Sequence, residues 1–406
     1  MVYIIKKDGT KEEFDANKIK RAVNKSAGRV MYRFTDDEIN FICKYATDRA
    51  EAMSRERKGG KIMIQDMHNI VEGALEQVNP AVAKSYRDYR NYKVDFIHMM
   101  DEVYTKSQSI RYIGDKSNAN TDSALVATKR SLIFNELNKE LYRKFFMNRN
   151  ELQACKDGYI YIHDQSARLD TMNCCLFDVG SVLRGGFEMG NVWYNEPKTL
   201  DTAFDVMGDI ILSTAAQQYG GFTVPEVDKI LSPYAQKSYN KYYEEFLKYS
   251  DPSWEGREEK GRVYAWEKVC RDCDQGWQGI EYKLNTVGSS RGDYPFVTVT
   301  LGLGTGRFEK MISKSLLKVH MGGQGKAGHK KPVLFPKIVF LYDEEIHGDG
   351  KECEDVFEAG VACSAKTMYP DWLSMSGQGY ISSMYKKYKK VISPMGCRAF
   401  LSPWYE

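Results

Sequence analysis

Two places in the sequence carry cysteines whose surroundings could support chemistry. Cys397 lies in "VISPMGCRAFLSPWYE", where the Pro-Met-Gly setting is typical of a turn. Cys174 and Cys175 are adjacent in "LDTMNCCLFDVG", a spacing that matches no metal site. A thiol can act as a nucleophile, a metal ligand or the seat of a radical, but most cysteines are small buried side chains. From these residues alone, packing is the favoured interpretation of each.

Two further motifs contain residue types that bind metals or transfer protons in other proteins. Cys270 and Cys273 form "CRDC", the spacing of half a zinc site, but no second pair lies nearby and the segment is charged and helical in pattern. We therefore expect a structural role for them and no metal site. His163 and Asp164 follow the run "YIYIH" and could form an acid–base pair, although such a pair at a strand end is more often structural.

Three polar loops, two of which contain glycines, suggest a phosphorylated, sugar-like ligand. Residues 117–127, "SNANTDSALVA", place amides and hydroxyls before a helix, where they can cap the helix or hold a phosphate or ribose. Residues 217–228 contain two adjacent glycines that permit close backbone approach, and residues 285–306 lead from a polar turn into a strand. Each loop alone is weak evidence, but together the three loops favour such a ligand over a hydrophobic one.

The elements that must position these residues fall into two parts. Residues 1–95 predict a small α+β module: a hairpin turning at Asp8-Gly9, then four helices, one of which opens with the capping box Thr35–Glu38. From about residue 100, long helical patterns alternate with β-rich runs, which predicts an α/β sheet or barrel. The predicted strands include "YIYIH", "FVTVTLGLG" and "VLFPKIVFLYD".

Composition excludes several classes of protein. A length of 406 residues favours two or three domains, and a net charge of +3 without a basic block argues against direct nucleic-acid binding. The N-terminus does not resemble a secretory signal, and no apolar run reaches the length of a membrane span. Nine scattered cysteines then indicate reduced thiols in a cytoplasmic compartment.

In their order along the chain, these motifs resemble the anaerobic (class III, glycyl-radical) ribonucleoside-triphosphate reductases. The opening "IIKKDGTKEEFDANKIKRAV" resembles the ATP-cone, the regulatory domain of many ribonucleotide reductases. The remainder resembles the catalytic domain through "SNANTDS", "YIHD…MNCC", "QQYGGFTVPEVDKILSPY", "NTVGSSRGDYPFVTVTLG", "FPKIVF" and "SPMGCRAFLSP". The resemblance implies an α/β protein with an ATP-cone at 1–95, followed at 96–406 by the first part of a ten-stranded α/β barrel.

The resemblance also implies roles for individual residues. Cys397 matches the thiyl-radical cysteine that removes the ribose 3′ hydrogen, and Cys174 matches the second cysteine, which helps the 2′-hydroxyl leave as water. Cys175 has no assigned role, and the reductant is either formate or a small redoxin protein. The expected substrate contacts are Asn118, Asn120, Asn173, Gly220, Gly221, Ser290 and Arg291.

For the ATP-cone, the resemblance implies ATP and dATP as allosteric effectors. The expected nucleotide contacts are Lys6, Glu12, Glu13, Phe14, Asp15, Ala16, Asn17, Lys18 and Arg90. A threonine contact common in the family corresponds here to Ile64, so that contact is absent from the expected set.

This chain departs from the family pattern in one respect, and two other classes of protein are alternative interpretations of its sequence. Relatives continue past the radical cysteine into a zinc site and a radical-storing glycine, so we expect this chain to need a complementary C-terminal chain or segment and a radical-SAM activating enzyme. The complete enzyme is expected to be a homodimer. A pyruvate formate-lyase relative would lack the ATP-cone, and a non-catalytic ATP-cone regulator would not need both cysteines and the polar loops.

Overall fold

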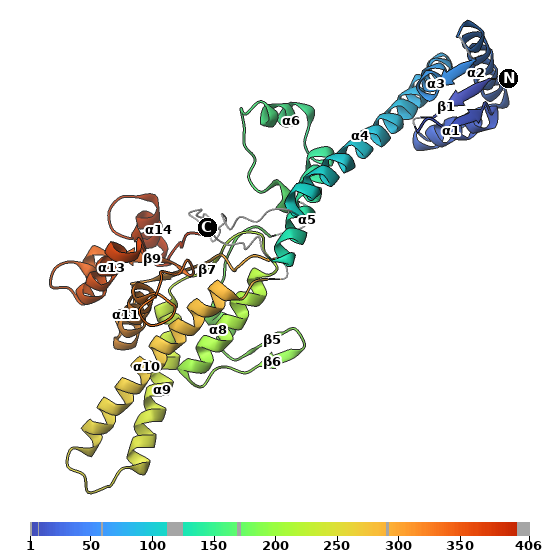
Figure 1. Cartoon of the computed structure of the whole chain (residues 1–406). Helices are drawn as coiled ribbons and strands as arrows, with labels where there is room; N and C mark the ends of the chain where they lie inside the picture. The colour runs from blue at the N-terminus through green and yellow to red at the C-terminus, as the bar shows by residue number, and fades with distance from the viewer. Residues whose placement is uncertain are drawn as a thin grey trace. The chain divides into compact units, whose positions relative to one another are not determined.

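The chain forms two compact units, residues 1–105 and residues 106–406 (Figure 1). The computed structural model describes residues 2–6, 8–57, 60–111, 125–168, 172–289 and 292–395. The two units meet within one helix, α4 (Pro80–Arg111), ten residues beyond the boundary expected from the sequence. Each unit is described below by itself.

The first unit is the expected hairpin with helices. Its sheet has the order β2-β1-β3, with β1 antiparallel to β2 and parallel to β3. Its elements are β1 (Tyr3–Ile5), β2 (Lys11–Glu13), α1 (Ala16–Arg29), α2 (Asp36–Glu56), β3 (Lys61–Met63), α3 (Ile64–Val78) and the first part of α4. The predicted capping box is confirmed: the amide of Glu38 donates to Thr35 Oγ1 at 3.3 Å, and the Glu38 carboxylate accepts from the Thr35 amide at 2.8 Å.

The second unit alternates helices with short strands, as its sequence predicts. Its helices are α5 (Val126–Phe145), α6 (Arg149–Lys156), a 3₁₀ turn (Gln165–Ala167), α7 (Val179–Leu183), α8 (Leu200–Ala215), α9 (Val227–Tyr249), α10 (Arg257–Thr286), α11 (Arg307–Gly322), α12 (Glu344–His347), α13 (Glu354–Thr367) and α14 (Tyr380–Tyr388). Helices α9 and α10 lie side by side as a long antiparallel pair (Figure 1).

Five of its strands form one parallel sheet in the order β10-β9-β8-β7-β4. These strands are β4 (Cys175–Leu176), β7 (Phe222–Val224), β8 (Val297–Leu301), β9 (Lys337–Tyr342) and β10 (Asp371–Ser374). A separate antiparallel hairpin consists of β5 (Phe187–Met189) and β6 (Val192–Tyr194). The α/β class predicted from the sequence is therefore confirmed, with helices connecting parallel strands.

The two faces of the parallel sheet differ in chemistry because side chains alternate along each strand. In β8, Val297, Val299 and Leu301 belong to the large apolar core, which also includes residues of α8, α9, α10, α11 and α13. Thr298 and Thr300 point to the opposite face, although both are buried. The register pairs Thr223 of β7 with Thr298, so this second face carries a row of hydroxyls.

Residues 391–395 lie on this hydroxyl face. The Thr223 hydroxyl donates to the carbonyl oxygen of Pro394 at 2.9 Å, and the hydroxyls of Thr300 and Ser393 are 3.4 Å apart. Val391 packs beside a small apolar cluster that includes Val339, which the register pairs with Thr300 on the same face. The segment therefore passes over β8 and then β7, in the direction of β4.

One predicted strand is wrong. Residues 159–163, "YIYIH", form no strand in the described part of the chain. Tyr159 is 84% exposed and Tyr161 is 86% exposed, so the alternating pattern has neither a buried face nor a neighbouring strand. A period of two describes an extended chain, but it becomes a strand only when another backbone pairs with it.

A buried carboxylate holds the loop that follows β8. Asp228, in the first turn of α9, is fully buried, and its Oδ2 accepts hydrogen bonds from the amides of Gly302 at 3.0 Å and Gly304 at 3.2 Å, and from the Ser313 hydroxyl at 3.2 Å. Burial raises the pKa of Asp228, while these amides oppose that rise. Asp228, which the sequence places in a candidate ligand loop, thus joins α9, α11 and the end of β8.

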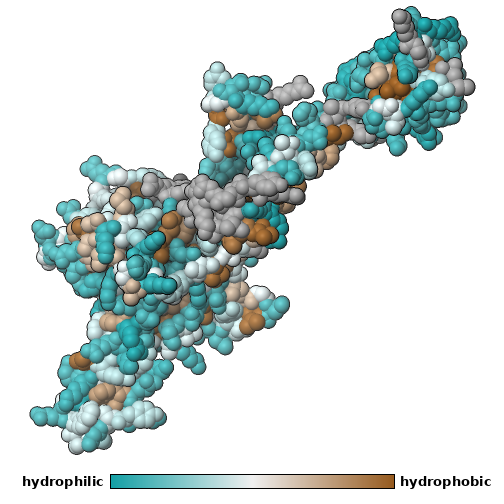
Figure 2. Space-filling model, in the orientation of Figure 1, coloured by the Kyte–Doolittle hydropathy of each residue, from teal (hydrophilic) through white to brown (hydrophobic). Residues whose placement is uncertain are grey.

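The visible surface is largely hydrophilic, with apolar side chains scattered in small groups (Figure 2), as is usual for a folded domain. Among the helices that the structure describes, none combines the length and apolar character needed to cross a bilayer.

Replacing Asp228 should destabilise the second unit. Asp228→Ala leaves three buried donors without their acceptor, and we expect a loss on the order of 3 kcal/mol in the free energy of unfolding. All six tryptophans lie in residues 106–406, so urea unfolding followed by tryptophan fluorescence reports on this unit. The exposed Asp349→Ala is the matched control, and equal midpoints for the two variants would contradict this role of Asp228.

His347 should make the second unit less stable in mild acid. Its side chain is buried, Nε2 donates to the carbonyl oxygen of Gly302 at 2.9 Å, and Nδ1 accepts from the Asp343 amide at 3.0 Å. Burial lowers the pKa of His347, with hydrogen bonds to backbone carbonyls opposing the change. The unfolded chain therefore binds the proton more readily, so stability is lost as pH falls below about 6.5, the value in unfolded chains.

The measurement is the urea midpoint at about pH 5.5 and 7.5 for the native chain, for His347→Gln and for the exposed control His329→Gln. We expect the native chain and the control to lose stability at the lower pH by more than His347→Gln does. An equal pH dependence in all three would show that His347 is not the responsible group.

Candidate functional site

Cys174 lies immediately before β4, next to the glycines of the 217–228 loop. Its Sγ accepts a hydrogen bond from the Gly221 amide at 3.2 Å, and the Gly220 amide donates to the carbonyl oxygen of Asn173 at 2.6 Å. Leu176 is paired with Thr223, so continuing the alternation by two residues places Cys174 on the hydroxyl face of the sheet. Residues 391–395, which lead towards Cys397, lie on the same face.

Gly220 is required by this packing. A Cβ at this position would lie 2.5 Å from both Cys174 Sγ and Asn173 Oδ1 and 2.7 Å from the Asn173 carbonyl oxygen. Real Cβ atoms do not approach so closely, and all three contacts are with Asn173 and Cys174, the residues on which the site depends. The close backbone approach expected from "QQYGG" is therefore present, and it serves to admit the Cys174 side chain.

Cys175 points to the other face of the sheet. The register pairs it with Phe222, and it packs against the large apolar core. Its Sγ lies 2.6 Å from Nε2 of the buried Gln218, and burial raises the pKa of the Cys175 thiol. The neighbouring thiols thus have separate environments, and the one on the core side is held in its neutral form.

A chain of polar contacts leads from the Cys174 thiol to His163. Cys174 Sγ is 3.8 Å from Asn173 Oδ1, and Asn173 Nδ2 donates to Asp164 Oδ2 at 3.1 Å. The same carboxylate oxygen lies 2.5 Å from His163 Nδ1. Asp164 has a φ of 53°, a left-handed conformation that few residues other than glycine adopt. The pair expected to be structural is thus connected to a candidate catalytic thiol.

Two of the three polar loops are anchored close to these residues. A small cavity of about 60 Å³ is lined by residues of both the 217–228 and the 285–306 loops, among them Gly220, Gly288 and Asp293. Thr128, in the first turn of α5, donates to the carbonyl oxygen of Gly292 at 2.8 Å, and a Cβ on Gly292 would strike Thr128. The structure therefore brings the start of α5 to the 285–306 loop.

Several expected site residues lie outside the described part of the chain. These are Asn118, Asn120, Ser290, Arg291 and Cys397. Of the expected substrate contacts, Asn173, Gly220 and Gly221 are described, and they lie together around Cys174.

The "CRDC" pair occupies one helix, α10. Cys273 is completely buried in the core, and burial raises its pKa; Cys270 is half-buried, and burial raises its pKa as well. Among the residues described here, no group of three or more His, Cys, Asp or Glu side chains is arranged to hold a metal ion.

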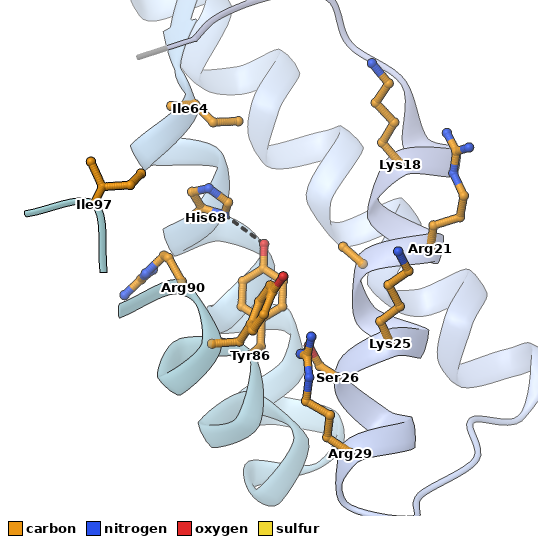
Figure 3. Close-up of a pocket in the computed structure, with 12 residues that line it drawn as sticks. Lys18, Arg21, Lys25, Ser26, Arg29, Ile64, His68, Tyr86, Arg90 and Ile97 are labelled. Atoms are coloured by element: carbon orange, nitrogen blue, oxygen red, sulfur yellow. Dashed lines mark hydrogen bonds between the residues drawn. The ribbon is translucent and has the colours of Figure 1, made fainter. Parts of the chain in front are cut away.

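The first unit contains a much larger cavity, of about 660 Å³, between α1, α3 and α4 (Figure 3). Five cationic side chains line it, and none of the described residues on its wall is acidic. The lining residues are Lys18, Arg21, Ala22, Lys25, Ser26, Arg29, Ile64, His68, Tyr86, Tyr89, Arg90 and Ile97. Such a cavity attracts an anion, and its tyrosines and isoleucines offer apolar surface for a ring.

Aromatic groups hold one wall of this cavity in place. His68 Nδ1 is 2.9 Å from the Tyr86 hydroxyl, a contact drawn in Figure 3, and burial raises the pKa of Tyr86 to about 12. The Arg29 guanidinium lies 3.8 Å from the centre of the Tyr89 ring. Tyr86 therefore stays neutral at physiological pH and leaves the cations of the cavity uncompensated by a phenolate.

The expected nucleotide contacts divide into two groups. Lys18 and Arg90 line the cavity, and so does Ile64 at the position of the family's threonine. Lys6 is connected to the cavity indirectly: its Nζ lies 2.7 Å from the Glu12 carboxylate, which also pairs with Lys18.

The other expected contacts are on the hairpin and at the start of α1. Asp15 caps α1 by accepting from the Asn17 amide at 2.8 Å, and Phe14 packs against the core of the unit. Glu13, Phe14, Asp15, Ala16 and Asn17 do not line the cavity.

Sequence reasoning missed the basic stripe along α1. Arg21, Lys25 and Arg29 follow Lys18 at steps of three, four and four residues, so all four lie on one face of the helix. That spacing was visible in "NKIKRAVNKSAGR". His68, Tyr86 and Tyr89 come from α3 and α4, and only the folded arrangement joins them to the stripe.

Comparison with known proteins agrees with both parts of this description. Residues 2–94 match the family model of the ATP cone domain, and residues 117–406 match that of the anaerobic ribonucleoside-triphosphate reductases. The chain is 31% identical to the anaerobic ribonucleoside-triphosphate reductase of Haemophilus influenzae, over 99% of this chain and 55% of that protein. It is 36% identical to that of Enterobacteria phage T4, over 71% of this chain and 46% of the phage protein.

Among solved structures, the chain is similar to an anaerobic ribonucleotide reductase from Thermotoga maritima, with a TM-score of 0.43 and 14% identity, covering 70% of this chain and 50% of that one. The chain spans about half the length of the curated relatives that it matches over nearly all of its own length. The matches extend over both units and include the residues around Cys174 and Cys397. The chain is a member of the anaerobic ribonucleoside-triphosphate reductase family and carries an N-terminal ATP-cone.

Proposed function

We propose that this chain supplies the effector-binding unit and the two reactive cysteines of an enzyme that reduces ribonucleoside triphosphates to deoxyribonucleoside triphosphates for DNA synthesis. The observation that carries the proposal is the hydroxyl face of the parallel sheet. Cys174 stands at one edge of that face, and residues 391–395 cross it immediately before Cys397 in the sequence. Family membership supports the reaction, and the geometry supports this pair of cysteines for it.

In this proposal the two thiols act on opposite sides of the ribose. Cys397, as a thiyl radical, takes the 3′ hydrogen, and Cys174 gives a proton to the departing 2′-hydroxyl, which leaves as water. Formate or a redoxin protein supplies the two electrons. The Gly221 amide, which donates to Cys174 Sγ, favours the thiolate that remains after proton transfer.

The remaining components belong to the family and are proposed for the assembled enzyme. A radical stored on a glycine would generate the Cys397 radical, and a radical-SAM enzyme would create it. A complementary C-terminal chain or segment would carry that glycine and a zinc site, and the complete enzyme would be a homodimer. The eight described cysteines are all free thiols, which supports our assignment to the reducing cytoplasm.

The cavity of the first unit is the proposed site for ATP and dATP as allosteric effectors. A triphosphate would lie along the cations of α1, where Lys18, Arg21 and Lys25 follow one another on the helix face. Charge-assisted hydrogen bonds to phosphate are among the stronger polar contacts in proteins. The base would lie against the apolar and aromatic part of the wall near Ile64 and Tyr86.

Removing one cation of this cavity should weaken effector binding by about tenfold or more, because each lost charge-assisted hydrogen bond costs roughly 1.5–3 kcal/mol. Calorimetry with ATP and with dATP on the full chain would compare Lys18→Met and Arg21→Gln with the native protein. Arg55→Gln, which removes a cation from α2 outside the cavity, is the control. No saturable heat in the native chain, or equal weakening by the control, would exclude this site.

The reaction itself should depend on both thiols. We expect Cys397→Ser and Cys174→Ser to abolish formation of deoxynucleotides, because a hydroxyl cannot readily form or sustain the corresponding radical and is a weaker acid than the thiol. The assay is anaerobic, with ribonucleoside triphosphate, the activating enzyme and a chain bearing the C-terminal radical segment. Cys270→Ser on α10 is the control and should retain activity, whereas turnover by Cys397→Ser would refute the proposed chemistry.

A further inference from the structure

We infer that Asp164 is a positioning residue for the Cys174 thiol, acting through the amide of Asn173. This inference rests on the proposed role of Cys174 and adds a group outside the sheet that sets the state of its thiol. The Asp164 carboxylate receives Asn173 Nδ2 at 3.1 Å and lies 2.5 Å from His163 Nδ1. With its nitrogen fixed in this way, the Asn173 amide presents Oδ1 to the Cys174 thiol at 3.8 Å.

The backbone at Asp164 supports a role beyond local packing. Its φ of 53° places it in the left-handed region, where strain is typically retained for a reason that the surrounding structure enforces. The Asp164 carbonyl oxygen also accepts from the Ala167 amide at 3.0 Å, which begins the turn Gln165–Ala167. The side chain is only 17% exposed, so its carboxylate is held between His163 and Asn173 with little solvent around it.

The contacts around the thiol oppose one another. The Gly221 amide donates to Cys174 Sγ and favours the thiolate, whereas Asn173 Oδ1 accepts the S–H and favours the thiol. The negative charge of Asp164 acts in the same direction as Asn173. By fixing the amide, Asp164 therefore keeps Cys174 protonated, the state that a proton donor to a leaving hydroxyl requires.

The charged and titratable neighbours of this group come from the same stretch of chain and from the loop beside it. His163 is 73% exposed, its ring lies 6.2 Å from that of Tyr161, and its carbonyl oxygen accepts from the Arg168 guanidinium at 3.5 Å. From the neighbouring loop, the Tyr219 hydroxyl accepts from the Ser166 hydroxyl at 3.3 Å. His163 is thus the titratable group closest to the Asp164 carboxylate among the contacts described.

The test is the pH profile of Cys174 alkylation by iodoacetamide in the full chain, resolved from Cys175 by peptide fragmentation. Asp164→Gly removes the carboxylate while permitting the left-handed backbone. We expect its midpoint to fall by at least about half a pH unit, a roughly threefold faster reaction below the midpoint. Asp164→Asn keeps an acceptor oxygen and tolerates this backbone, so its midpoint should lie between those of Asp164→Gly and the native chain.

The exposed Asp157→Asn removes a similar charge from the loop after α6 and should leave the profile unchanged. A native-like profile for Asp164→Gly, or an equal shift in Asp157→Asn, would overturn the inference. A midpoint for Asp164→Asn equal to that of Asp164→Gly would overturn the role of the hydrogen bond. Because no substrate, radical or partner chain is present, the result does not depend on whether the assembled enzyme reduces nucleotides.

Discussion

The hydrogen bond from the Thr223 hydroxyl to the carbonyl oxygen of Pro394 joins two segments that are 171 residues apart in the sequence. Everything proposed about the two cysteines depends on it, because it brings the chain before Cys397 onto the face of the sheet that carries Cys174. Both groups are buried, so replacing the hydroxyl with a methyl would leave a carbonyl oxygen without a partner at a cost of about 1–3 kcal/mol. The core-facing side of the same strands could not provide such a contact.

One face of the sheet packs against the helices, and the other face carries the residues that we propose for catalysis. Valine, leucine and phenylalanine side chains of β7 and β8 anchor the sheet to the helices, and Cys175 joins them there. The threonines of the same strands contact residues 391–395, and Cys174 lies at the edge of their face. The adjacent cysteines therefore lie in different environments, because a strand turns successive side chains to opposite sides. Strands β4, β7 and β8 contain no charged residue, and such a site of hydroxyls and thiols suits radical chemistry that must exclude competing reactants.

The cavity that we propose for effectors follows a different electrostatic principle. Its cations line one helix face, and the nearby carboxylate of Glu12 pairs with Lys6 and Lys18 at the hairpin. An anion entering the cavity would compete with Glu12 for Lys18, so binding could be transmitted to the hairpin through that ion pair. Arg29 stacks on the Tyr89 ring and Arg21 donates to the Asn17 carbonyl oxygen, so a ligand would add negative charge to a stripe whose partners are otherwise uncharged.

Much of this arrangement could be predicted from the sequence where the signal is local. The capping box at Thr35, the strand at "FVTVTLGLG" and the two-part organisation all depend on neighbouring residues, and the basic stripe of α1 could have been found by the same reasoning. The strand predicted at "YIYIH" is wrong because an alternating pattern contains no information about a partner strand. The contact between Asp164 and Asn173, and the approach of Gly220 to Cys174, join separate segments and become visible only in the folded chain.

The central claim is that residues 391–395 lie across the hydroxyl face of the sheet, and a disulfide tests it most directly. The hydroxyls of Thr300 and Ser393 are 3.4 Å apart, close enough for a disulfide if both residues are replaced by cysteine. The account predicts that Thr300→Cys/Ser393→Cys forms this bond on mild oxidation, identified by mass spectrometry of the linked peptides. Two cysteines that stay unlinked and are readily alkylated after oxidation would contradict it, because the segment would then lie elsewhere.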